Sequence, residues 1–297
     1  MSLWEAVVLG LVQGLTEYLP VSSTAHVRIA SALLGGKDAG AAFTAVIQLG
    51  TTAAVILFFA KDIVQFAKAS WEALQHKNPF HSADSKTAFF VLLGTLPIGI
   101  CGLAFRNFIR NEARSMLVVS FALVAFGLLL LLAEKRGKQQ RSLADMKQKD
   151  AWVLGLWQAI ALVPGASRSG VTITGALLSN FNRADAARYS FLLSIPATGL
   201  AGLFELRTFL RESAGEDWLA LGLGTAVAFL SGMAAIWFLM RLVRRHSLNG
   251  FAYYRIALGA VLLWASFQGL MRYPPPSRKP TWKRLPPRRR RPGDIHS

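Results

Sequence analysis

Long apolar runs alternate with shorter polar segments along most of this 297-residue chain. Four of the runs contain no charged residue and reach the roughly 17–25 residues that cross about 30 Å of hydrocarbon, and two shorter runs need polar flanks to do so. The pattern predicts an all-α integral membrane protein with about six transmembrane helices. The six predicted spans are Phe43–Ala60, Thr87–Phe105, Met116–Ala133, Tyr189–Phe204, Trp218–Met240 and Ile256–Met271.

Two further apolar stretches are too short to span and are interrupted by polar or helix-breaking residues. Ala6–Thr16 leads into Glu17 and Pro20, and Ala151–Val163 leads into Pro164. Such interruptions predict re-entrant (broken) helical segments, because irregular backbone at membrane depth must be surrounded by protein or by a water-filled cavity. We expect a functional site where these two segments meet.

The two broken segments resemble each other in sequence. VLGLVQ (residues 8–13) aligns with VLGLWQ (residues 153–158), and one deletion then brings Ser23 onto Ser167. Each copy precedes three predicted spans, and because three is odd, the second copy enters the membrane from the opposite side. The order predicts an inverted-topology repeat. Chance is the alternative, since leucine, glycine and alanine are common in membrane helices.

The repeat divides the chain into four parts. Basic loops tend to be cytoplasmic, which places residues 134–150 inside the cell. Alternating spans then place the loop 61–86 inside and the loop 205–217 outside. Glu5, with no basic region before it, is not typical of a cleavable signal. The parts are a first repeat (1–133), a basic cytoplasmic loop (134–150), a second, inverted repeat (151–271) and a Pro/Arg-rich tail that we expect to be disordered (272–297).

Composition agrees with a membrane protein and adds a strong positive charge. Apolar residues form 53% of the chain and charged residues 16%, against roughly 25% charged in soluble proteins, which excludes a disordered chain and most soluble enzymes. The net charge is +17, and the tail holds +8 of it, from nine basic residues and one acidic residue. Anionic lipid headgroups suit this tail better than nucleic acid, which we do not expect as a partner. The single Cys101 excludes an intrachain disulfide and a thiolate zinc cluster.

Ionisable side chains inside an apolar membrane domain are costly and are candidates for function. Gln13 and Glu17 are four residues apart and share a helix face. Ser22 and Ser23 lie where the next helix begins, and Ser23 is three residues before His26, so hydroxyl and imidazole also share a face. Each group has a structural alternative: the serines as caps or packing contacts, and the histidine as a donor to a carbonyl.

The second broken segment offers an anion site. In PGASRSGVT (residues 164–172), the hydroxyls of Ser167 and Ser169, the Arg168 guanidinium and the free N–H groups of a helix start come together. The planar fork of arginine suits phosphate oxygens. A carboxylate such as Glu17, together with phosphate oxygens, suits a hard divalent cation. A purely structural ion pair between Glu17 and Arg168 is the alternative.

These stretches resemble the signatures of a known family. QGLTEYLPVSST (residues 13–24) followed by His26 is similar to the first motif of bacterial undecaprenyl-diphosphate phosphatases, also called bacitracin-resistance proteins. PGASRS (residues 164–169) with Thr172 is similar to their second motif, PGxSRSxxT. The similarity runs in order and spacing over roughly residues 1–272 and leaves out the tail. Shorter matches are IQLG (residues 47–50) and SFLLSIP (residues 190–196).

The resemblance implies a multi-pass enzyme of the bacterial plasma membrane, with interlocked inverted repeats, that hydrolyses undecaprenyl diphosphate to undecaprenyl phosphate and phosphate. This reaction recycles the lipid carrier of peptidoglycan synthesis and confers bacitracin resistance. A divalent cation, Mg²⁺ or else Ca²⁺, is expected, held by Glu17 and the substrate phosphates. The expected partners are a polyprenyl diphosphate lipid and the bilayer, and a homo-oligomer stays open. The implied residues are Glu17, His26, Arg168 and Ser23 as catalytic, Ser22, Gly165, Ser167, Ser169 and Thr172 as diphosphate-binding, and Gln13 as assisting.

Two departures from the family pattern and two alternatives bear on the mechanism. Ala25 stands where a glycine is usual, and Gln13 takes the neutral option of the first motif, so a mechanism with two carboxylates there is in doubt. The nucleophile is either water activated by Glu17 or His26, or the Ser23 hydroxyl activated by His26. The rival class is transport, since secondary transporters also place charged sites between inverted repeats; the protein would then flip a polyprenyl phosphate lipid.

Overall fold

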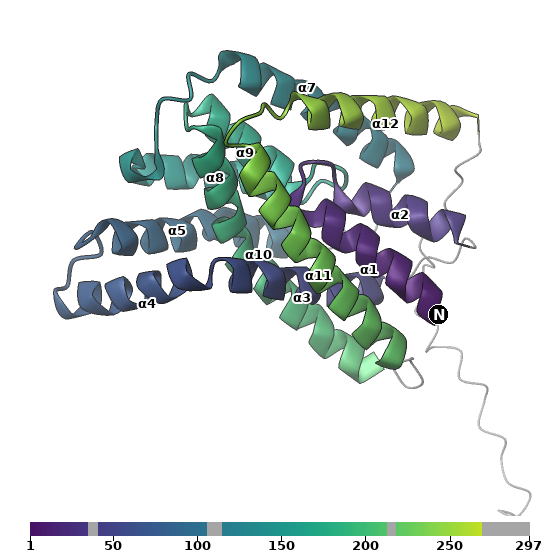
Figure 1. Cartoon of the computed structure of the whole chain (residues 1–297), viewed down its shortest axis with the longest axis horizontal. Coiled ribbons are helices and arrows are strands. Elements are labelled where there is room, and N and C mark those ends of the chain that lie inside the picture. Colours follow the sequence, from purple (N-terminus) through teal and green to yellow (C-terminus); the bar gives the residue numbers. More distant parts are fainter. Residues whose placement is uncertain (35–40, 106–114, 213–217, 269–297) are drawn as a thin grey trace, which may run out of the picture.

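A computed structural model describes residues 1–34, 41–105, 115–212 and 218–268, and these ranges are almost entirely helical (Figure 1). They contain eleven α-helices and one short 3-10 helix, and their only β pairing is a single bridge between Arg141 and Phe181. The all-α prediction is confirmed. The helices are α1 (Leu3–Tyr18), α2 (Ser23–Leu33), α3 (Ala41–Phe58), α4 (Ala60–Gln75), α5 (Ala83–Ala104), α7 (Met116–Arg136), α8 (Gln148–Ile160), α9 (Arg168–Leu178), α10 (Arg183–Glu212), α11 (Trp218–Leu242) and α12 (Asn249–Phe267), with the 3-10 helix η1 at Leu143–Asp145.

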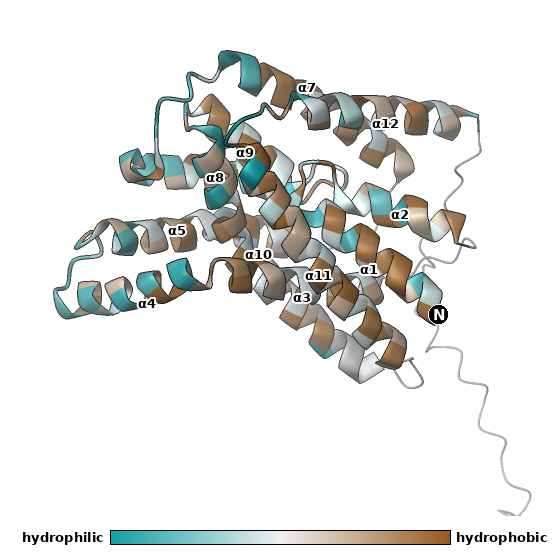
Figure 2. Cartoon of the chain, in the orientation of Figure 1, coloured by the Kyte–Doolittle hydropathy of each residue, from teal (hydrophilic) through white to brown (hydrophobic). Residues whose placement is uncertain are grey.

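Four helices, α5, α7, α11 and α12, are long and apolar enough to cross a membrane. A fifth crossing is added if α3 and α4, which bend by 71° at their junction, count as one span. Figure 2 shows α11 apolar over most of its length, whereas polar residues recur along α4. The chain is therefore a multi-pass membrane protein. The predicted span at Tyr189–Phe204 lies within α10, which is not among these helices.

Two segments expected as loops are helical. The segment 61–86 contains α4 and the start of α5, which lie side by side as a hairpin (Figure 1). The segment 205–217 continues α10 as far as Glu212, and residues 213–217 lie outside the described ranges, as does the tail 272–297. In α4 the charged residues fall on one face of an amphipathic helix, a pattern that a search for continuous apolar runs overlooks.

The two broken segments have the same backbone design. Each short second helix, α2 or α9, has eleven residues and follows a serine N-cap, Ser22 or Ser167, whose φ is 75° or 69°. Positive φ is unfavourable for a residue with a side chain, so both breaks hold strained backbone. Ser22 and Ser167 are 145 positions apart, like residues 8 and 153. The structural equivalence thus needs no deletion, and it matches Ser23 with Arg168 rather than with Ser167.

Each broken helix packs on a long helix from the other half of the chain. Helix α1 runs along α11, and α8 runs along α5. A Cβ atom on Gly10 would lie 2.3 Å from the Gly224 carbonyl oxygen, and one on Gly155 would lie 2.6 Å from that of Gly94. These approaches are too close for any side chain. Equivalent glycines therefore let both broken helices contact the backbone of their partners.

The loop before α8 is fixed by one ion pair. Arg141 donates hydrogen bonds to both carboxylate oxygens of Asp150 and to the Ser179 carbonyl, and its guanidinium stacks 4.4 Å from the Phe181 ring. Burial raises the pKa of Asp150, but hydrogen bonds from Arg141 and from the Lys147 amide outweigh it and bring the pKa below its ordinary value. The pair ties the start of α8 to the end of α9.

Candidate active site

The two broken segments meet at Glu17, in the last turn of α1. Glu17 is 7% exposed, and its carboxylate accepts four hydrogen bonds. Gln13 Nε2 and Ser23 Oγ donate to Oε2 over 2.8 and 2.7 Å. Gln48 Nε2 donates to Oε1 over 3.0 Å, and Arg168 forms an ion pair with the same oxygen. Because a carboxylate has about four acceptor positions, this one is fully occupied and fixed in orientation.

The hydroxyl proton of Ser23 is directed at Glu17. Residue Ser23 is the first of α2, and its Oγ lies 2.7 Å from the carboxylate. The sequence had paired this hydroxyl with His26, but the imidazole makes its hydrogen bonds elsewhere. The group placed to take the Ser23 proton is therefore the carboxylate.

The contacts of His26 assign its tautomer. Its Nδ1 lies 2.8 Å from the Ser22 carbonyl oxygen, which can only accept, so Nδ1 carries a proton. In the neutral ring Nε2 is then the acceptor, and the Tyr254 hydroxyl donates to it over 2.6 Å. The two rings also stack with centroids 5.6 Å apart. The nitrogen able to exchange a proton thus faces Tyr254 of α12.

The second break supplies a rigid helix start. The Ser167 hydroxyl caps α9 by accepting from the Gly170 amide, and it also lies 3.3 Å from the Ser169 hydroxyl. Ser169 donates to the Leu19 carbonyl over 3.1 Å, which joins the two breaks. Gly165 has φ +94°, and a Cβ there would lie 2.5 Å from a carbonyl of α7, so only glycine fits. This geometry holds Arg168 against Glu17.

Thr172 lies apart from this group. Its hydroxyl is buried, donates to the Arg168 carbonyl over 2.7 Å and forms a second, short hydrogen bond with Ser190 of α10. The residue fastens α9 to α10. Its direct contact with a diphosphate stays a prediction.

Three polar residues around the breaks are not among the site residues predicted from the sequence. Gln48 had a signal, because it is an uncharged polar residue inside an apolar run and belongs to the IQLG match. Tyr254 and Arg255 had little signal in the sequence. The predicted span begins at residue 256, so the arginine is expected to flank the membrane rather than to lie inside a helix. In the structure Arg255 is inside α12 and fully buried. Helix α12 therefore belongs to the site.

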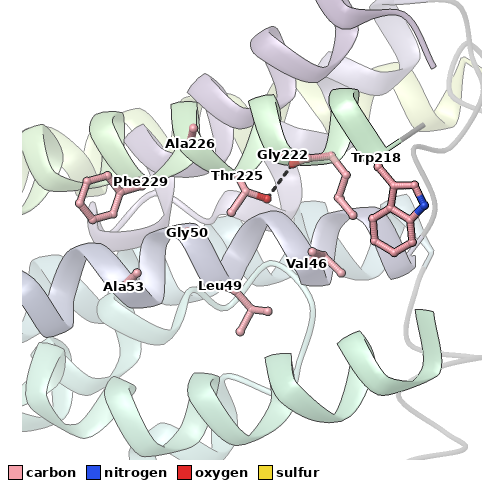
Figure 3. Close-up of a pocket in the computed structure, with 10 residues that line it drawn as sticks. Val46, Leu49, Gly50, Ala53, Trp218, Gly222, Thr225, Ala226 and Phe229 are labelled. Atoms are coloured by element: carbon pink, nitrogen blue, oxygen red, sulfur yellow. Dashed lines mark hydrogen bonds between the residues drawn. The ribbon is translucent and has the colours of Figure 1, made fainter. Parts of the chain in front are cut away.

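An apolar groove of about 530 Å³ lies between α3 and α11 (Figure 3). Val46, Leu49 and Phe229 are among its lining residues, and the Thr225 hydroxyl is satisfied by the Leu221 carbonyl. The groove offers no charged group and cannot hold a phosphate, but it suits a hydrocarbon chain. Helix α3 connects it to the carboxylate, because its Gln48 contacts Glu17 while neighbouring residues line the groove.

Comparison with known proteins agrees with the motifs. The family model for the bacitracin resistance protein BacA matches residues 6–261. The undecaprenyl-diphosphatase of Myxococcus xanthus (strain DK1622) is 56% identical over 263 residues, 89% of each chain. Those of Chlorobium phaeobacteroides (strain BS1) and Corynebacterium striatum are each 45% identical; they cover 89% of this chain and 96% and 94% of their own lengths. The similarity contains both broken segments and ends before the tail.

Proposed function

Because the chain belongs to the bacitracin resistance protein BacA family, we propose that it hydrolyses undecaprenyl diphosphate to undecaprenyl phosphate and phosphate. This reaction recycles a lipid carrier for peptidoglycan synthesis in the bacterial plasma membrane and confers bacitracin resistance. The observation that carries the proposal is the pairing of Glu17 with Arg168 across two broken helices, beside a serine hydroxyl. The match covers both of these segments.

Arg168 is the phosphate-binding residue in this proposal. It is the first residue of α9, where free N–H groups and the positive end of the helix dipole also favour an anion. The diphosphate competes with Glu17 for the guanidinium, and its greater charge favours the exchange. Ser22, Gly165, Ser167 and Ser169 belong to the backbone turns beside this position.

Glu17 acts on the nucleophile. Once Arg168 turns to the phosphate, the carboxylate loses a positive partner and becomes a stronger acceptor for the Ser23 proton. In the serine route, Ser23 Oγ bonds to the terminal phosphorus while the bond to the bridging oxygen breaks, and undecaprenyl phosphate leaves. Water then hydrolyses the phosphoserine. In the water route, Glu17 takes a proton from water, and Ser23 only orients the carboxylate.

His26, in the first turn of α2, is the second proton-transfer group in this proposal. Its Nε2 is the exchanging atom, and Tyr254 holds that nitrogen in place. An imidazole can both accept and donate a proton, which suits general acid–base catalysis. Gln13 assists by fixing Oε2 of Glu17.

A divalent cation, Mg²⁺ or else Ca²⁺, would fit this site if it is held jointly by the protein and the substrate. Among the residues described, no group of three His, Cys, Asp or Glu side chains could hold a metal alone. Glu17 would hold the ion with substrate oxygens and water, which is a usual arrangement for Mg²⁺, and the ion would neutralise phosphate charge. Since the carboxylate is fully occupied, the ion must take the place of one donor.

We assign part of the prenyl chain to the groove between α3 and α11. It is apolar, and α3 links it to Glu17 through Gln48. The inverted repeats and six spans belong to the same proposal, with parts 1–133, 134–150 (cytoplasmic), 151–271 and 272–297. The equal breaks at Ser22 and Ser167 and the exchanged packing of α1 and α8 support it.

Phosphate release from undecaprenyl diphosphate by the purified protein in detergent with Mg²⁺ tests the activity. Wild-type protein should release phosphate, and chelation of the metal by EDTA should stop the release. Phosphate release in the presence of EDTA would exclude a divalent cation from the mechanism. A phosphoserine trapped at Ser23, together with a large loss of kcat in Ser23→Ala, supports the serine route. A Ser23→Ala variant that keeps most of the wild-type kcat supports water as the nucleophile.

Transport is the second candidate, because secondary transporters also place their sites between inverted repeats, and the exchanged packing of α1 on α11 and α8 on α5 supports such repeats here. Proteoliposomes with a labelled polyprenyl phosphate separate the two functions. Flipping without phosphate release would replace the enzyme by a flippase. Phosphate release without flipping would exclude transport.

A further inference from the structure

Arg255 connects the two breaks through their backbone carbonyls. It is 0% exposed, and its guanidinium fork reaches both irregular segments. Nη1 donates to the Pro20 carbonyl over 3.4 Å, and Nη2 donates to the carbonyls of Gly165 and Ala166 over 3.2 and 2.8 Å. We propose that Arg255 is a positioning residue that sets the distance between the two broken helices of the catalytic site.

The Arg255 guanidinium donates its hydrogen bonds to backbone carbonyls rather than to a carboxylate. Within residues 1–34, 41–105, 115–212 and 218–268, the four ion pairs involve other arginines, and no carboxylate pairs with Arg255. Burying a charge costs several kcal/mol unless hydrogen bonds compensate it. Here Nη1 and Nη2 donate to three carbonyls that lie between helices, while the buried Nε has no hydrogen-bond partner. The charge and the irregular backbone thus stabilise each other.

Gly170 shows how closely the first turn of α9 rests on this guanidinium. A Cβ atom at Gly170 would lie 2.4 Å from Arg255 Nη1 and 3.1 Å from the Ser167 Cβ. The turn that carries Arg168 therefore sits on Arg255 with no room for a methyl group. Since the same nitrogen bonds the Pro20 carbonyl, three residues after Glu17, any shift of Arg255 changes the spacing of Glu17 and Arg168.

The consequence for activity rests on the proposed function. A displacement near 1 Å of groups that must align for reaction can lower the rate by about 100-fold. Arg255 touches neither Glu17 nor the Arg168 side chain, so its loss should change their alignment rather than remove a binding group. The effect should fall on kcat, while KM for the diphosphate stays near the wild-type value.

Three variants test the assignment: Arg255→Lys, Gly170→Ala and the double variant. Lysine keeps the charge but loses the fork, so Arg255→Lys should lower kcat by about 10- to 100-fold with KM within about threefold. Gly170→Ala should lower kcat similarly, because its methyl pushes the guanidinium away. In the double variant lysine makes room for the methyl, so its kcat should be no lower than that of Gly170→Ala.

Arg244→Lys and Gly250→Ala are matched controls, because Arg244 is exposed and a Cβ at Gly250 meets nothing within 4 Å. Both should keep wild-type kcat, and melting temperatures of all variants separate misfolding from misalignment. A wild-type kcat in Arg255→Lys overturns the inference, as do losses that multiply in the double variant. If Arg255→Lys fails to fold, a wild-type kcat in Gly170→Ala is sufficient to overturn the inference. An inactive wild-type protein overturns the proposed function instead.

Discussion

The first and second breaks share a backbone but differ in their side chains. Both begin a helix of eleven residues after a serine at positive φ. The first break carries an acceptor, a hydroxyl and an imidazole, in Glu17, Ser23 and His26. The second carries the cation Arg168 at the position equivalent to Ser23. In the proposed mechanism, one backbone design thus serves proton transfer in one half and anion binding in the other.

A difference in helix length brings the acid into the site. Helices α1 and α8 begin at the equivalent positions Leu3 and Gln148, but α8 ends at Ile160, which corresponds to residue 15 of α1. Helix α1 runs three residues farther and so carries Glu17 to the meeting point. The breaks are therefore similar enough to pair and different enough to divide the chemistry.

Removing the acid should have the largest effect. Glu17→Gln keeps the shape and several hydrogen bonds but loses the charge that accepts the proton, so kcat should fall by about 10²–10⁴-fold. Phosphate release under saturating substrate measures it. Glu72→Gln on the exposed face of α4 is the matched control and should behave as wild type. Equal kcat values in the two variants would show that the Glu17–Arg168 pair has only a structural role.

The contact of the first break with α12 should matter less. Tyr254→Phe removes one hydrogen bond to His26, worth about 1.4 kcal/mol, so kcat should fall by about tenfold. Tyr253→Phe alters the neighbouring exposed tyrosine and should leave kcat unchanged. Equal kcat values for the two variants would remove Tyr254 from the site.

The groove should affect chain recognition only. Gly222 lines the groove, and a Cβ atom there meets nothing within 4 Å, so Gly222→Phe should occupy groove volume without a backbone clash. Displacing one or two methylenes, at about 0.8 kcal/mol each, should raise KM for the long substrate by roughly four- to fifteenfold. A short prenyl diphosphate should lose less. Gly99→Phe on α5, equally unhindered, is the control, and equal KM values would place the chain elsewhere.

The ion pair that anchors the second break should change stability and not activity. Asp150→Asn loses charged hydrogen bonds worth about 1.5–3 kcal/mol, which should lower the melting temperature by several degrees. Because the folded pKa of Asp150 lies below its unfolded value of about 3.9, the contribution is present above that pH and disappears as the pH falls through the folded pKa. Wild type and variant should therefore converge in stability at low pH; a constant difference would contradict the assignment.

The sequence predicted the local contacts of this site and the meeting of its two broken segments, but it missed the helices that reach the site from elsewhere. Residues four apart on one helix, such as Gln13 and Glu17, contact as helical periodicity requires, and proline marks the first break. Gln48, Tyr254 and Arg255 reach the site from helices distant in sequence, and no local pattern encodes such contacts. The predicted span within α10 is not among the helices that meet the length and hydropathy requirement in the described part of the chain, so the sixth span stays a proposal.

The division between the breaks can be measured with a non-hydrolysable prenyl bisphosphonate, since binding is then separate from catalysis. In Glu17→Gln, Arg168 is free of its carboxylate partner, so Kd should equal or fall below the wild-type value. In Arg168→Lys the bidentate fork is lost, and Kd should rise by about tenfold or more. A weaker complex with Glu17→Gln and an unchanged one with Arg168→Lys would contradict the account.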